Sequence, residues 1–130
     1  MVPSNNLQTI TIVIVEDHPD TRSLLSYFLT RQGARAIAVG DAADGLLAIQ
    51  QHHPDVVLSD IGLPNRNGFE LLKDIRCLHS EEDRRVPVVA MTALGKTVER
   101  QKIIAAGFQG LLRKPFTPDE LLHVLQSVLQ

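Results

Sequence analysis

Five short apolar runs recur along the chain, and each has the length of a β-strand. They cover residues 10–15, 34–39, 55–59, 86–91 and 110–113. Most positions in these runs are apolar, without the strict polar alternation of a strand that has one face in water. The pattern predicts strands that are buried on both faces, as in a parallel sheet.

Helical patterns separate and follow these runs. They begin at Asp17 or His18, at Asp41, near Asn67, near Thr97 and at Thr117-Pro118, and Gly33 and Gly107 stop the first and the fourth. In the first helix the spacing predicts a core-facing stripe formed by Thr21, Leu24, Leu25 and Phe28. The charged segment HSEEDRR, after the third helix, is expected to be a solvated loop.

Five strands that alternate with five helices predict a doubly wound α/β fold, in which helices cover both faces of a five-stranded parallel sheet. In such sheets the loops that follow the strands gather at one edge, and ligands bind there. No repeat, low-complexity tract or linker interrupts the pattern. One compact domain is therefore expected.

Composition narrows the classes of partner. The 130 residues are 44% hydrophobic and 22% charged, which suits an ordinary globular domain without a membrane span. With 13 basic and 15 acidic residues the formal charge is -2, which argues against nucleic acid as a direct partner. The first residues lack the pattern of a secretory signal, so a cytoplasmic location is expected. The single cysteine, Cys77, is interpreted as a structural residue of an amphipathic segment.

Polar residues stand where four of the predicted strands end. They are Glu16 and Asp17, Asp60, Thr92, and Lys114, which precedes Pro115. Each has a structural explanation when taken alone: an acidic residue before a helix is most often an N-cap, and threonine is a common strand residue. His18 has no second histidine at ligand spacing, so capping or solvent exposure is favoured for it.

Taken together, these groups favour a binding site. Three carboxylates at neighbouring strand ends repel one another, and they must either take up protons or attract a cation. Oxygen ligands without cysteine suit Mg²⁺, or Mn²⁺, and Mg²⁺ leaves coordination places for phosphate oxygens. Lys114 and Thr92 could then contact a phosphoryl group, and Asp60, beside Gly62 and Pro64, is the best candidate for a nucleophile.

The motifs VEDHP, SDIGLPNRNG, MTA and RKPF together resemble the receiver domains of two-component response regulators, over almost the whole chain from about Ile10. The resemblance implies a flavodoxin-like fold with strand order 2-1-3-4-5 and a phosphoacceptor at Asp60. It also implies Mg²⁺ held by Glu16, Asp17, Asp60 and the Gly62 carbonyl. The boundaries expected are an extension over residues 1–9 and a receiver domain over 10–130.

The same resemblance assigns further positions. Thr92, the backbone of Ala93 and Lys114 would contact the phosphoryl oxygens, and the bond before Pro115 would be cis. The family's aromatic switch position is occupied here by Leu111, which places the usual switch in question. Several motifs look especially like receivers of hybrid histidine kinases. The implied partners are a histidine kinase or histidine phosphotransfer protein and a downstream protein, with neither nucleic acid nor membrane.

The beginning of the first helix lies beside the predicted site. Arg22, Ser23 and Ser26 stand off its apolar stripe, so this face is expected to dock the phosphodonor.

Two other classes share parts of this pattern. Dehalogenase-like phosphatases also form an aspartyl phosphate, but their Asp-x-Asp motif is absent because EDHPD spaces its aspartates differently. A flavodoxin-like nucleotide binder needs a phosphate-cradling first loop, whereas this loop is acidic and the chain has no GxGxxG. We therefore expect a phosphoacceptor switch rather than a metabolic enzyme.

Overall fold

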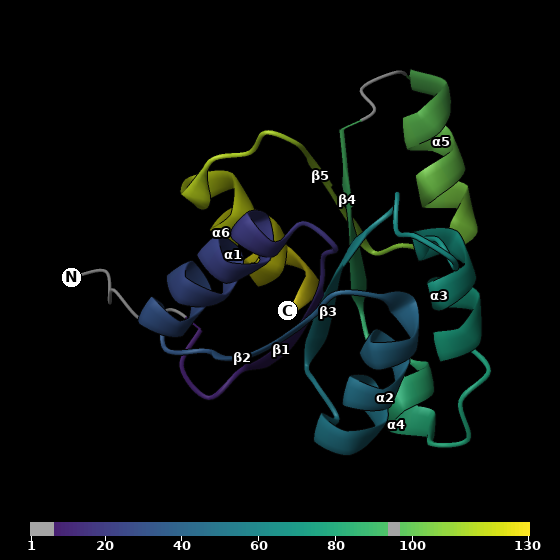
Figure 1. Cartoon of the computed structure of the whole chain (residues 1–130), viewed down its shortest axis with the longest axis horizontal. Helices are drawn as coiled ribbons and strands as arrows, with labels where there is room; N and C mark the ends of the chain where they lie inside the picture. Colours follow the sequence, from purple (N-terminus) through teal and green to yellow (C-terminus); the bar gives the residue numbers. More distant parts are fainter. Residues whose placement is uncertain (1–6, 94–96) are drawn as a thin grey trace.

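The computed structural model describes residues 7–93 and 97–130, and these residues form a parallel five-stranded sheet between two layers of helices (Figure 1). The strand order is β2-β1-β3-β4-β5, as expected. The strands are β1 Thr11–Val15, β2 Arg35–Val39, β3 Val56–Asp60, β4 Val88–Thr92 and β5 Gly110–Arg113.

Two helices cover one face of the sheet, and the remaining helices lie on the other face (Figure 1). The first pair is α1 Pro19–Arg31 and α6 Pro118–Val128. The other layer contains α2 Ala42–His52, α3 Gly68–Ile75, α4 Glu81–Arg84 and α5 Thr97–Ala106. Each layer has its own hydrophobic cluster, so the sheet is buried on both sides.

The two clusters divide the residues of each central strand by alternation. Val13 and Val57 pack with the α2 and α3 side, whereas Ile12 and Leu58 pack with the α1 and α6 side. All four side chains are fully buried. This explains the continuous apolar runs of the sequence, because successive side chains of a strand point to opposite faces and both faces are covered.

Polar caps begin the helices where the sequence predicted them. Asp41 and Thr117 accept hydrogen bonds from backbone N–H groups of α2 and α6. Asn67 does the same for α3 and forms a capping box with Glu70. These caps fix where each helix leaves the loop that follows a strand.

The expectation of five helices was wrong, because the described residues contain a sixth, the single turn α4, within the segment expected to be a loop. Ser80 caps this turn by accepting a hydrogen bond from the Asp83 N–H, and three acidic residues occupy its N-terminal turn, where the helix dipole favours negative charge. The Asp83 side chain is buried and accepts from His53 Nδ1 at 2.9 Å.

The structure also bears on the expectations for Leu24, Cys77 and the N-terminal extension. Leu24 is 68% exposed, so it is not in the core stripe of α1, which is buried through Leu25 and Leu29. Cys77 is exposed, so it is not a core residue. Within the proposed N-terminal extension, residues 1–6 lie outside the described residues, and Leu7 is buried in the core. The boundary at residue 10 stays a prediction, although packing already begins at Leu7.

Candidate functional site

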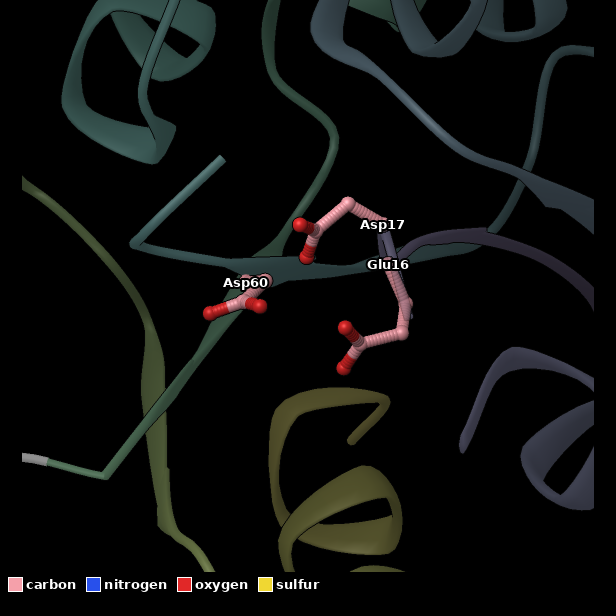
Figure 2. A group of neighbouring side chains, drawn as sticks. All are labelled: Glu16, Asp17 and Asp60. Carbon is pink, nitrogen blue, oxygen red and sulfur yellow. The ribbon is translucent and has the colours of Figure 1, made fainter. Parts of the chain in front are cut away.

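Three carboxylates converge at the carboxyl edge of the sheet (Figure 2). Glu16 and Asp17 follow β1 directly, and Asp60 is the last residue of the adjacent strand β3. One carboxylate oxygen from each of the three residues lies within 4.8 Å of the others. Parallel pairing of Val15 with Ser59 brings the two strand ends level, which places these side chains together. The sequence prediction of an acidic cluster is therefore confirmed.

Exposure increases from one carboxylate to the next. Glu16 is 1% exposed, Asp60 is partly buried, and Asp17 is exposed. Carboxylates brought this close repel one another, and burial makes the charge on Glu16 costlier still. A nearby positive charge therefore stabilises the cluster in its ionised form.

Lys114 supplies one positive charge from the end of β5. Its Nζ donates to Glu16 Oε1 at 2.5 Å and to Asp60 Oδ2 at 3.3 Å. Its backbone N–H donates to the Thr92 carbonyl at 2.7 Å, which ties the loop to the end of β4. The Lys114–Pro115 peptide bond is cis, as the resemblance implied.

The pKa shifts of this pair follow from burial and proximity. Burial raises the pKa of the Glu16 carboxyl, and the hydrogen bond from Lys114 opposes that rise. Burial alone would lower the pKa of Lys114, but its bonds and charge interactions with Glu16 and Asp60 outweigh burial and raise it. Lys114 is therefore a firmly charged group held between two carboxylates.

The capping explanation for Asp17 does not hold. The N-cap of α1 is His18, whose Nδ1 accepts from the Thr21 N–H at 3.3 Å. His18 in turn donates its own N–H to Glu16 Oε2 at 3.1 Å. Because His18 caps the helix, Asp17 is left beside Asp60 without a capping role, and the favoured role for His18 is confirmed.

The loop after Asp60 is tight at Gly68 rather than at Gly62. An added Cβ at Gly68 would lie 2.6 Å from the Asp60 carbonyl oxygen, whereas at Gly62 it would meet nothing within 4 Å. The Gly62 N–H donates to Asp60 Oδ1 at 3.2 Å. Sequence reasoning gave weight to Gly62 and assigned no role to Gly68, because the approach of α3 to the Asp60 backbone is a tertiary contact.

The remaining predicted residues border this cluster. Thr92 is buried as the last residue of β4, and Ala93 is the exposed residue after it. Leu111 lies on β5 opposite Ala90 and packs partly buried against the cluster on the α2, α3 and α5 side. Their contacts with a phosphoryl group, like the ligand role of the Gly62 carbonyl, stay predictions.

The donor set fits a hard divalent cation. Three carboxylates within 4.8 Å offer only oxygen ligands, and exposed Asp17 leaves one side of the cluster open to water and substrate oxygens. Mg²⁺ prefers such oxygen ligands and retains water. An α/β sandwich that gathers three carboxylates and a lysine at one edge suits chemistry on a phosphoryl group.

Comparison with known proteins gives the family. Residues 12–126 match the response regulator receiver domain. An uncharacterized 14.6 kDa protein of Leptolyngbya boryana is 34% identical over 121 residues, which cover 93% of this chain and 91% of that protein. The sensor histidine kinase RcsC of Escherichia coli is 34% identical over 88% of this chain, which spans only 12% of the kinase. The chain belongs to the response regulator receiver domain family.

A solved structure supports the same placement. The receiver domain of the sensor histidine kinase PA1611 from Pseudomonas aeruginosa has a TM-score of 0.82 and 31% identity, covering 92% of this chain and 97% of that one. That structure carries a magnesium ion in its active-site cleft. The chain is thus a receiver domain of the kind used in two-component signalling, found both in response regulators and in hybrid kinases. Within the described residues, no helix is long and apolar enough to cross a membrane.

Proposed function

We propose that Asp60 accepts a phosphoryl group from a phosphohistidine, and that Glu16, Asp17, Asp60 and the Gly62 carbonyl hold Mg²⁺ for this reaction. The observation that carries the proposal is the convergence of three carboxylates and Lys114 around the end of β3. Asp60 contacts both the lysine and the acidic pair, since its Oδ2 accepts from Lys114 and its carboxylate lies beside Asp17.

The residues divide the chemistry among themselves. An Asp60 carboxylate oxygen attacks phosphorus, and the bond from phosphorus to the donor imidazole nitrogen breaks as the new bond forms. Mg²⁺, when bound, neutralises the charge that carboxylates and phosphoryl oxygens bring together. Lys114 Nζ lies 3.3 Å from Asp60 Oδ2. In the proposed reaction Lys114, Thr92 and the backbone N–H of Ala93 contact the phosphoryl oxygens. Leu111 replaces the family's aromatic switch residue, so we assign it only a short displacement.

The acceptor is tested by phosphorylation with acetyl phosphate and Mg²⁺, followed by intact-protein mass spectrometry. Wild type gains one phosphoryl group, and Asp60→Asn gains none because the nucleophilic oxygen is lost. Asp20→Asn is the matched control, since Asp20 is an exposed carboxylate in the first turn of α1. Labelling of Asp60→Asn to the wild-type extent refutes the assignment.

The donor is proposed to be a histidine kinase or histidine phosphotransfer protein that docks on α1. Arg22 was expected to face this partner. Its guanidinium instead donates to the Glu16 carbonyl, in the loop after β1. Ser23 is exposed as expected and Ser26 is partly buried, and the exposed residues of α1 also include Leu24 and Tyr27. Leu24 also borders a pocket that contains Lys114, which supports docking beside the acceptor.

Docking is tested with two leucines of similar exposure on different helices. Leu24→Glu on α1 should slow transfer from the phosphohistidine donor, and Leu47→Glu on α2 should not. Labelling by acetyl phosphate should be the same in both variants. If both leucine variants slow transfer equally, the docking face is not α1.

Several finer assignments belong to the same proposal. The domain acts as a signalling phosphoacceptor whose phosphorylation alters binding of a downstream protein, and it hydrolyses its own aspartyl phosphate. Mg²⁺ is the resident metal, with Mn²⁺ as a substitute in the same oxygen site. A cytoplasmic location, with neither nucleic acid nor membrane as a direct partner, stays the expectation from the sequence.

A further inference from the structure

Arg22, the fourth residue of α1, reaches back to the loop that carries the acidic pair. Its Nη1 donates to the Glu16 backbone carbonyl at 3.0 Å, and the side chain is partly buried. Among the described residues, no carboxylate lies within ion-pair distance of its guanidinium. The backbone carbonyl is thus the partner towards which this arginine is directed.

Gly40, the residue after β2, leaves the space that the guanidinium occupies. An added Cβ at Gly40 would lie 2.8 Å from Arg22 Nη1 and 3.7 Å from Cζ, and no other atom that it would meet lies within 4 Å. Gly40 is therefore not required by its own backbone packing. What its missing side chain provides is room for Arg22.

The Glu16 backbone is held on both sides as a result. Its N–H donates to the Val39 carbonyl of β2 at 3.0 Å, and its carbonyl accepts from Arg22. The Glu16 carbonyl and the Asp17 nitrogen belong to one planar peptide unit. Fixing that carbonyl therefore fixes the direction in which the chain enters Asp17, the most exposed of the three acidic residues.

We propose that Arg22 is a positioning residue for the metal site, and that Gly40 is the glycine that lets it act. Arg22 holds the Glu16–Asp17 peptide plane so that the Asp17 carboxylate stays beside Asp60 before metal arrives. This inference rests on the proposed Mg²⁺ site. Groups that orient metal ligands affect affinity strongly, typically by 10–100-fold, and Arg22 acts through the backbone, so the low end applies.

Gly40→Ala is the sharpest test because it keeps every charge. Its Cβ displaces only the end of a flexible side chain, so the fold should hold while the bond to Glu16 breaks. We expect Mg²⁺ affinity to fall about tenfold with little change in the thermal midpoint. Amide shifts in an NMR titration measure the affinity, since the chain has no tryptophan to report metal by fluorescence.

A double-mutant cycle separates positioning from general damage. Arg22→Ala should weaken Mg²⁺ binding to a similar degree, and adding Gly40→Ala to it should cost nothing more because the two changes break one contact. Arg31→Ala removes an arginine from the last turn of the same helix, where it stacks on Tyr27, and should leave the affinity unchanged.

The Mg²⁺ titrations distinguish failure of the positioning role from failure of the proposed metal site. Wild-type affinity in both Gly40→Ala and Arg22→Ala overturns the positioning role, and so do losses that add fully in the double variant. If wild type itself binds no Mg²⁺, the proposed function fails instead, so the two failures are distinguished by the first titration.

Discussion

Gly68→Ala is expected to damage both the stability of the domain and its acceptor site, because α3 begins against the backbone of Asp60. The new Cβ would lie 2.6 Å from the Asp60 carbonyl oxygen and 2.9 Å from Ile61 Cα. Both are main-chain atoms that cannot rotate away. The Gly68 N–H also donates to the Ile61 carbonyl at 2.9 Å, so the helix cannot retreat without losing that bond.

The magnitude follows from two opposing effects. Alanine gains about 0.5–1 kcal/mol over glycine in the middle of a helix and less at Gly68, the first residue of α3, whereas overpacking of this kind costs about 1–3 kcal/mol. The clash is the larger effect, so we expect a net loss of about 1–2 kcal/mol. For 130 residues this corresponds to a thermal midpoint lower by about 3–8 °C. A shift of the Asp60 main chain should also slow labelling by acetyl phosphate about tenfold, since positional errors near 1 Å cost up to about 10²-fold.

Urea unfolding followed by far-ultraviolet circular dichroism measures the stability, and mass spectrometry measures the labelling rate. Gly62→Ala is the matched control, because Gly62 lies in the same loop after Asp60. Its Cβ would meet nothing within 4 Å, so its stability should stay within about 0.5 kcal/mol of wild type. Wild-type stability and labelling in Gly68→Ala would show that the close approach to Asp60 does not constrain the site.

Two further outcomes follow from charged pairs. Lys114→Met should destabilise the metal-free domain by about 1–3 kcal/mol because Glu16, which is 1% exposed, loses its cationic partner. Urea unfolding measures this loss, and adding Glu16→Gln should restore part of it. His53 has a raised pKa because Asp83 accepts its hydrogen bond, so its stabilisation should be complete below pH 6.5 and should disappear as pH rises through the raised value. Thermal midpoints of wild type and His53→Gln should therefore differ most at acidic pH, and a constant difference at every pH contradicts the sign.

The sequence determined the five strands, five of the helices and the polar groups at the strand ends, because these depend on local chemistry. Apolar runs without alternation predict strands covered on both faces, and Asp41, Asn67 and Thr117 mark helix starts through hydrogen bonds made within a few residues. Polar residues after several parallel strands must meet at one edge, whatever the details of packing. The acidic cluster and the presence of Lys114 near it therefore follow from the pattern alone.

Only the tertiary structure decided which of several similar side chains are buried and which partners they contact. Leu24 and Leu25 fit the same helical spacing, but the direction from which the sheet and α6 approach buries Leu25 and leaves Leu24 exposed. The short helix α4 carries a buried carboxylate, Asp83, whose hydrogen-bond partner His53 lies 30 residues away in the sequence. From the sequence, Arg22 was expected on the exposed face of the first helix. Gly40, which follows β2, provides the space for its guanidinium, and the Glu16 carbonyl is its partner. Both contacts depend on long-range packing, which sequence periodicity does not contain.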